Sequence, residues 1–232
     1  MTPEEVKAWR KSLRARLIEA RNALPAETLT RYREIIDRYL ERGFAGLARG
    51  VLAFCWPYKG EYDARFLART LREQGAVTAL PVVVAPKTPL VFREWHPGVR
   101  LDSGVLGIPY PVGSREVAPD SVIVPLVGFD DAGYRLGYGG GYFDRTLEAL
   151  ARRPVVIGVA YEGAHLDTIH PQPHDIPMDW IVTERGIYRR DGGRLEFLGA
   201  PLAGEPSALS SPVCYAREVD PGYFGGSSSG SG

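Results

Sequence analysis

The sequence is poor in cysteine and has no long hydrophobic run. Cys55 and Cys214 are the only cysteines in 232 residues, and they lie in different contexts. We therefore expect no disulfide framework, and this cysteine usage is typical of a reducing compartment. No apolar stretch approaches membrane-spanning length, and the N-terminal segment is charged and amphipathic, unlike a signal peptide. These absences predict a cytoplasmic protein.

An excess of charge of either sign is also missing. Lys plus Arg and Asp plus Glu both number 28, so no global field would recruit nucleic acid or an acidic membrane. Any anion site must therefore be built locally. With 44% hydrophobic and 24% charged residues, the composition is that of a soluble globular protein with one substantial core. We expect a monomer that binds a small molecule and binds neither nucleic acid nor membrane.

Two amphipathic helices are predicted at the start of the chain. Thr2, Pro3 and Glu5 form a capping signal for the first helix, which is expected to run to about Leu24. The second follows Pro25 and stops at Gly43. The inward stripe of the first helix consists of Val6, Trp9, Leu13 and Leu17.

Strand and helix signals then alternate, which favours an α/β fold: one three-layer, Rossmann-like domain around a central, mostly parallel sheet. Strands are expected at residues 51–56, 78–85, 90–95, 121–129, 154–161 and 180–183. Further helices are expected at 63–73, capped by Asp63, and after Gly141, and a Gly/Pro-rich loop is expected at 97–119. A hairpin of residues 187–190 and 194–198 closes the domain, which spans 1–199, and residues 200–232 read as a flexible tail or linker.

The most informative motif follows the predicted strand at 121–129. Four glycines occupy five consecutive positions, 137–141, just before a helical pattern. Bare backbone N–H groups beside a helix N-terminus favour phosphate. Asp144 would be useful there if it held a magnesium ion bridging to that phosphate, and its substitution by Asn should then change folding stability little. The motif is neither a Walker A loop nor a dinucleotide-binding loop in its usual context.

Other polar residues allow two interpretations each. Arg10 and Arg14, with Lys11 beside them, form either a solvated helix face or a face that turns toward a phosphate-bearing ligand. Glu61 follows the first buried strand, where it either binds a ligand or complements a helix dipole. Trp56 near it either stacks on a flat ring or simply packs.

The loop acids and histidines favour no structural zinc. His165, His170 and His174 do not have the spacing of a helical histidine pair. Asp175 and Asp179 are interpreted as loop acids, one of which could be a second magnesium ligand. Nucleophilic Ser/His/Asp catalysis has no motif here, and Cys55 in an apolar strand is interpreted as a packing residue.

With these motifs together, residues 7–188 resemble the 5-formyltetrahydrofolate cyclo-ligase family. The most specific block is residues 124–134, which runs directly into the glycine loop. The supporting blocks are Lys11-Ser12-Leu13-Arg14, Gly60-Glu61-Tyr62-Asp63 and His174-Asp175-Ile176-Pro177-Met178-Asp179. The chain departs from the family pattern at Tyr110, where an acid is usual, and at Ala164, where a glutamine is common.

The resemblance implies an enzyme that uses ATP and Mg²⁺ to cyclise 5-formyltetrahydrofolate, possibly polyglutamylated, to 5,10-methenyltetrahydrofolate. Catalytic positions are expected at Arg14, Glu61 and Arg145. The positions expected to bind ATP are Arg10, Lys11, Arg14, Arg135, Leu136, Gly137, Tyr138, Gly139, Gly140, Gly141, Tyr142 and Phe143. The folate would contact Trp56, Glu61, Tyr138, Gly139, Gly140, Gly141 and Tyr142. Asp144 and Asp175 would bind the metal.

Two alternatives remain open. The chain could be an ATP-dependent enzyme of the same fold that acts on another small amide, which the residues at positions 110 and 164 would favour. It could also be a nucleotide- or folate-binding module without turnover.

Overall fold

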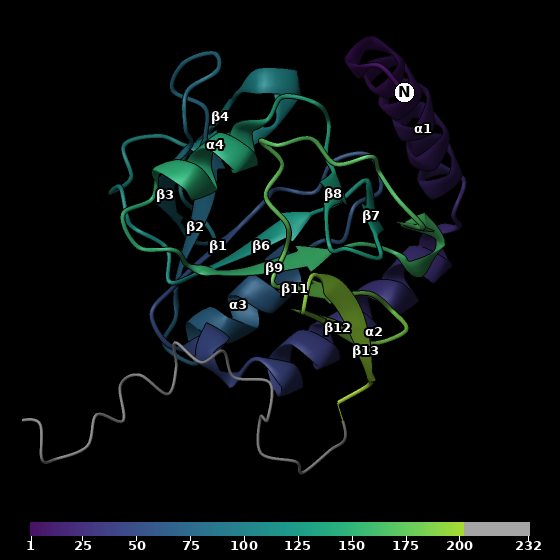
Figure 1. Cartoon of the computed structure of the whole chain (residues 1–232). Helices are drawn as coiled ribbons and strands as arrows, with labels where there is room; N and C mark the ends of the chain where they lie inside the picture. Colours follow the sequence, from purple (N-terminus) through teal and green to yellow (C-terminus); the bar gives the residue numbers. More distant parts are fainter. Residues whose placement is uncertain (202–232) are drawn as a thin grey trace, which may run out of the picture.

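A computed structural model describes residues 1–201 of the chain (Figure 1). The expected tail, residues 200–232, therefore lies outside the described residues except for its first two positions. Within residues 1–201, no helix is both long enough and apolar enough to cross a membrane.

The two N-terminal helices form where the capping signals predict them. Helix α1 spans Pro3–Asn22; the Thr2 hydroxyl accepts a hydrogen bond from the Glu5 N–H, and the Glu5 carboxylate accepts one from the Thr2 N–H. Helix α2 spans Ala26–Gly43 after Pro25. Helix α1 ends slightly before the predicted Leu24.

The central sheet has eight strands in the order β13-β12-β11-β9-β6-β1-β2-β3. Its inner strands β11, β9, β6, β1 and β2 are parallel, and β3, β12 and β13 pair antiparallel at the two edges. The strand bounds are β1 Val51–Phe54, β2 Val77–Val82, β3 Val91–Trp95, β6 Ser121–Pro125, β9 Val155–Val159, β11 Trp180–Val182, β12 Ile187–Asp191 and β13 Arg194–Gly199. The mostly parallel α/β fold and the closing hairpin are confirmed.

Helices cover both faces of this sheet, giving three layers (Figure 1). Helices α2 and α3 (Arg65–Glu73) lie on one side, and α4 (Tyr142–Ala149) lies on the other. Alternate residues of a central strand enter different hydrophobic clusters: Ile123 packs on the α2/α3 side, whereas Val122 and Val124 pack on the other. Burial on both faces explains why these strands read as continuous apolar runs.

The structure divides one predicted strand and adds a hairpin. Residues 121–129 form β6 and then β7 (Gly128–Asp130), which joins β8 (Arg135–Leu136) and β10 (His165–Leu166) in a separate small sheet. The predicted loop 97–119 contains the antiparallel pair β4 (Leu101–Ser103) and β5 (Pro109–Pro111). Short 3₁₀ helices span Ala45–Ala48, Val105–Gly107 and Glu162–Ala164.

The start of α3 also differs from expectation. Ala64 is the N-cap residue, whereas Asp63 was expected there. The Asp63 carboxylate instead accepts hydrogen bonds from the Arg65 N–H and from the Arg65 guanidinium. A local side-chain bond of this kind competes with a regular cap.

Candidate functional site

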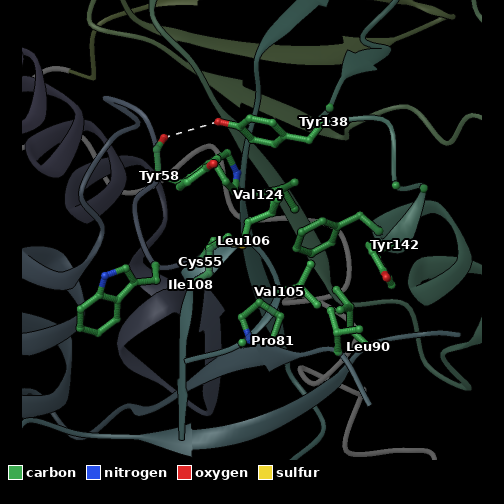
Figure 2. A pocket seen from close by; sticks show the side chains of 18 of the residues that line it. Cys55, Tyr58, Pro81, Leu90, Val105, Leu106, Ile108, Val124, Tyr138 and Tyr142 are labelled. Atoms are coloured by element: carbon green, nitrogen blue, oxygen red, sulfur yellow. Dashed lines mark hydrogen bonds between the residues drawn. The ribbon is translucent and has the colours of Figure 1, made fainter. Parts of the chain in front are cut away.

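A cavity of about 690 Å³ lies at the carboxyl ends of β1, β2 and β6. Ligands of parallel α/β sheets collect at this edge. Its walls come from α1, the segment after β1, the end of β2, the β4–β5 hairpin, the glycine loop and residues 174–175. Figure 2 shows Tyr58 and Tyr138 approaching each other on one side of this cavity.

One part of the wall, the carboxylate end, is built around Glu61. Its Oε1 accepts a hydrogen bond of 2.9 Å from the Tyr138 hydroxyl, and its Oε2 accepts one of 3.0 Å from the Tyr58 N–H. Arg21 Nη2 lies 3.8 Å from Oε1 and donates to the Tyr138 oxygen at 2.6 Å. The carboxylate end therefore consists of Arg21, Tyr58, Glu61 and Tyr138.

Burial dominates the electrostatics of this end. It raises the pKa of Glu61, and the charge of Arg21 and the hydrogen bonds from Tyr138 and Tyr58 oppose that rise. Burial and the neighbouring Glu61 also raise the pKa of the Tyr138 hydroxyl, which keeps it neutral and donating. Each carboxylate oxygen can accept a second hydrogen bond, so Glu61 still has capacity for a ligand donor.

The glycine loop faces the other part of the cavity. Gly139 and Gly141 have φ of +91° and +62°, in the left-handed region that favours glycine. A Cβ on Gly139 would lie 3.4 Å from Arg14 Nη2, and one on Gly141 would lie 2.7 Å from Arg145 Nη1. Gly141 is also the N-cap residue of α4, so bare backbone meets a helix N-terminus here.

Two arginines of α1 reach this loop and the loop before β11. Arg14 Nε donates to the Gly137 carbonyl at 2.5 Å, and within residues 1–201 its two Nη atoms make no hydrogen bond. Burial and the nearby Arg10 lower the pKa of Arg14. Arg10 donates to the Ile169 carbonyl and pairs with Asp175 at 2.5 Å. The basic helix face therefore turns inward over the cavity. We call this part of the wall the arginine end; it consists of Arg10 and Arg14 of α1, Arg135 of β8, and the four glycines at 137 and 139–141.

Both predicted metal ligands, Asp144 and Asp175, line the cavity and contact arginines. Asp144 Oδ1 lies 2.6 Å from Nη2 of the buried Arg135; this is a contact between opposite charges rather than a well-directed hydrogen bond. The same oxygen accepts a hydrogen bond from the Ile176 N–H. Asp175 Oδ2 accepts from Arg10 and from the Gln172 N–H. Burial alone would raise the pKa of Asp175, but these two hydrogen bonds lower it.

These acids fit Mg²⁺ in kind and number. In the part of the chain that the structure describes, neither Asp144 Oδ2 nor Asp175 Oδ1 accepts a hydrogen bond, and Asp175 Oδ1 lies 4.0 Å from His174 Nε2. Mg²⁺ usually binds one or two carboxylates, with waters and phosphate oxygens completing its shell. No group of three or more His, Cys, Asp and Glu side chains that could hold a metal ion occurs among residues 1–201. The pairing with Arg135 gives a physical reason to expect that Asp144→Asn lowers stability, which differs from the expectation from the sequence.

The remaining predicted positions divide into two groups. Trp56, Leu136, Tyr142 and Phe143 line the cavity, as does every residue of loop 137–141. Lys11 is exposed, and neither Lys11 nor Arg145 is among the lining residues of the described chain. Arg145 donates to the Gly140 carbonyl at 2.6 Å and lies over the Tyr142 ring, so it supports the loop from outside.

Residues that were not expected at the site also line it or support it. Cys55 follows β1 and lines the cavity; burial and Glu61 raise the pKa of its thiol, which keeps it protonated. Val105 and Leu106 of the β4–β5 hairpin are 52% and 60% exposed at the cavity wall. Arg21 was missed as well, although its position, four residues after Leu17 on the inward stripe of α1, is a signal for a buried charge.

Comparisons with known proteins agree over most of the chain. A model of the 5-formyltetrahydrofolate cyclo-ligase family matches residues 6–184. A 5-formyltetrahydrofolate cyclo-ligase of Mycolicibacterium smegmatis is 33% identical over 184 residues, which are 75% of this chain and 94% of the relative. The protein of the same name from Escherichia coli K12 is 33% identical over 138 residues, 56% of this chain and 76% of that protein.

Solved structures show the same fold. The 5,10-methenyltetrahydrofolate synthetase of Aquifex aeolicus superposes with a TM-score of 0.68 at 32% identity, covering 82% of this chain and 97% of that one. The synthetase of Mycoplasma pneumoniae has a TM-score of 0.62 at 24% identity, covering 75% of this chain and 98% of that one, and supports the fold alone.

Proposed function

The chain belongs to the 5-formyltetrahydrofolate cyclo-ligase family, and from this premise we propose that it cyclises 5-formyltetrahydrofolate to 5,10-methenyltetrahydrofolate with ATP and Mg²⁺, releasing ADP and phosphate. The observation that carries the proposal is that one cavity has a buried carboxylate at one end and, at the other, Arg14 Nη donors that make no hydrogen bond within residues 1–201. A reduced pterin and a triphosphate need these two kinds of partner.

Glu61 is the group that would recognise the pterin. The ring presents a row of N–H and amino donors, and a carboxylate can accept two of them. Tyr58, Tyr138, Trp56 and Tyr142 provide aromatic surface around the cavity for the ring face. A site built for these hydrogen bonds discriminates strongly, because a buried carboxylate without its partners is costly.

The arginine end would bind the triphosphate. Arg14 supplies two Nη atoms that make no hydrogen bond within the described residues, and the glycine loop supplies backbone N–H groups beside the N-terminus of α4. A guanidinium is well suited to phosphate because it is planar and always charged. Bound Mg²⁺, held by Asp144 and Asp175, would neutralise charge on the phosphates.

The chemistry requires positioning and charge stabilisation rather than a protein nucleophile. The formyl oxygen attacks the γ-phosphorus of ATP, the bond from that phosphorus to the ADP oxygen breaks, and the electrons of N5 complete a C=N bond. N10 then attacks the formyl carbon, the C–O bond breaks, and phosphate leaves with the former formyl oxygen while N10 loses its proton. Removing one positioned charge-stabilising donor from such a site typically costs about 10²–10³ in turnover.

The cellular setting expected from the sequence is part of the same proposal. The two cysteines and the balanced charge favour a monomeric enzyme in the cytoplasm. A folate substrate that carries a polyglutamate chain is proposed from the family resemblance alone.

One observation favours a second substrate class. Tyr110 lines the cavity at the place where the family pattern has an acid, so the pocket could be shaped for another small amide. In that case the ATP chemistry would stay the same and the accepted amide would differ.

The direct test is the absorbance of the methenyl product. We expect the protein to form this chromophore from 5-formyltetrahydrofolate only when ATP and Mg²⁺ are present. ADP release with another amide, and none with the folate, would favour the second substrate class. Folate and nucleotide binding without any turnover would identify a binding module instead and contradict the proposal.

A further inference from the structure

Arg21 lies behind the carboxylate end and is held from several directions. It is in the last turn of α1 and is 9% exposed. Its Nε donates to the Lys59 carbonyl at 2.9 Å, its Nη1 donates to the Leu126 carbonyl at 3.2 Å, and its Nη2 donates to the Tyr138 hydroxyl at 2.6 Å. All three nitrogens of one guanidinium are therefore engaged.

These three contacts join parts of the chain that are distant in sequence. Lys59 belongs to the segment that carries Glu61, Leu126 follows β6, and Tyr138 is in the glycine loop. The planar fork of an arginine can reach three such acceptors at once, whereas a lysine ammonium acts as a point charge on a flexible stem. Arg21 itself is not among the residues of the described chain that line the cavity.

The charge of Arg21 is the counterpart of Glu61. The other titratable groups facing Glu61 are Cys55, Tyr138 and Tyr161, and burial raises the pKa of each, that of Tyr161 to about 12. These groups are therefore neutral near pH 7. The Lys59 ammonium lies over the Tyr58 ring rather than against the carboxylate.

We propose that Arg21 is a positioning residue that fixes the Glu61 carboxylate and the Tyr138 hydroxyl toward the substrate without touching the substrate. The inference rests on the proposed function in one respect, because it takes Glu61 to be the pterin acceptor. It adds a residue that acts through Glu61 and Tyr138 and that has no direct contact with either ligand.

The consequence is a specific change in pH dependence. An opposite charge nearby favours the ionised form of an acid, so replacing Arg21 by a neutral residue raises the pKa of Glu61 further. Glu61 offers both of its oxygens as acceptors to the ring only when it is ionised, because a protonated carboxyl group turns one of them into a donor. When the pH is lowered, the variant therefore loses folate binding at a higher pH than the wild type does. ATP binding at the arginine end keeps the pH dependence of the wild type.

The test compares Arg21→Gln and Arg21→Lys with Arg16→Gln, a variant of an exposed arginine on the same helix. We expect Arg21→Gln to raise the KM for 5-formyltetrahydrofolate about tenfold or more and to move the acid limb of kcat/KM up by about one pH unit or more. The KM for ATP should stay within about twofold. Arg21→Lys keeps the charge, so its acid limb should return close to that of the wild type, and Arg16→Gln should change nothing.

Two results would overturn the inference. The first is an acid limb of kcat/KM that does not shift in Arg21→Gln. The second is an equal rise in the KM values for folate and for ATP that persists in Arg21→Lys, because a merely structural role would produce that pattern. If Arg21→Gln does not fold, Arg21→Lys decides the question alone. It should raise the folate KM and leave the ATP KM and the acid limb unchanged, and any other pattern contradicts the proposal.

The titration of Glu61 separates this inference from the proposed function. Carbon-13 NMR of labelled glutamate carboxyl groups, with the signal assigned by its loss in Glu61→Gln, reports that titration without any substrate. If the wild type forms no methenyl product, the proposed function fails. In that case, a higher midpoint of the Glu61 titration in Arg21→Gln would still support the contact between Arg21 and Glu61. Conversely, if the wild type is active but the midpoint in Arg21→Gln is unchanged, the inference about Arg21 is overturned.

Discussion

The two ends of the cavity use arginine and carboxylate groups in opposite ways. At the carboxylate end, Arg21 uses all three guanidinium nitrogens on protein acceptors, and Glu61 is held by Tyr138 and Tyr58. At the arginine end, Arg14 keeps both Nη atoms without a hydrogen bond within residues 1–201. The first end is fixed before any ligand arrives, whereas the second keeps charge available for one.

This difference fits the two proposed ligands. A pterin ring is recognised by the direction of its hydrogen bonds, which favours a rigid acceptor. A triphosphate with Mg²⁺ is recognised largely through charge, which lets Arg10 and Arg135 exchange part of their pairing with Asp175 and Asp144 when the ligand binds. Substitutions at the two ends should therefore affect different substrates.

Glu61→Gln should have the largest effect. It preserves shape but removes the charge that Arg21 faces and one of the two acceptor oxygens offered to the ring. We expect affinity for 5-formyltetrahydrofolate to fall at least about 100-fold while affinity for ATP is unchanged. Calorimetry with each ligand measures this directly. Equal folate affinity in the two proteins would count against the folate assignment and leave the arginine end standing.

Arg14→Ala should come next. It removes the two Nη donors proposed to contact phosphate, and a hydrogen bond to a charged group contributes about 1.5–3 kcal/mol. The KM for ATP should therefore rise roughly tenfold to a hundredfold, with little change in the KM for folate. Arg16→Ala on the exposed side of α1 is the matched control. Full activity and affinity in Arg14→Ala would mean that the basic face is only solvated.

Asp144→Asn should have a smaller and mixed effect. We expect a higher Mg²⁺ requirement and lower turnover, because the neutral amide is a poorer ligand for a hard cation. Since the buried Arg135 loses its ion-pair partner, the free energy of unfolding should also fall by about 1–3 kcal/mol. Glu148→Gln, an exposed position on the same helix, should change neither quantity. An unchanged Mg²⁺ titration would remove Asp144 from the metal site.

Deletion of residues 200–232 should have the smallest effect. Every group of both cavity ends lies before residue 199, and the family model ends at residue 184. The shortened chain should therefore melt at the same temperature and keep both KM values. A loss of solubility or activity on truncation would show that the deleted residues pack on the domain.

Most of the fold could be predicted because its signals are local. The cap at Thr2 and Glu5, the stop at Gly43 and the start of the buried run at Ser121 each depend on neighbouring residues, and each gave nearly the right boundary. The division of residues 121–129 was missed because both parts are equally apolar. After Leu126, however, the chain leaves the central sheet, and the Val127 N–H pairs with the Leu136 carbonyl of the small sheet.

The site was predictable only in part. The glycine loop and Asp144 are contiguous in sequence, so their common place at the cavity could be inferred. Arg21, Glu61 and Tyr138 come from three distant segments, and no local pattern shows that they meet. Lys11 does not line the cavity, and helix geometry explains why. Arg10 and Arg14 are one turn apart on the inward face of α1, whereas Lys11, which directly follows Arg10, lies on another side of the helix and is exposed.

Crossed rescue of turnover tests the division of the cavity most directly. Initial rates of methenyl formation are measured for Arg14→Ala and Glu61→Gln while ATP or 5-formyltetrahydrofolate is raised separately. The rate of Arg14→Ala should recover with ATP and not with folate, and the rate of Glu61→Gln should recover with folate and not with ATP. Recovery of both variants with the same substrate would contradict the assignment of the two ends to two ligands.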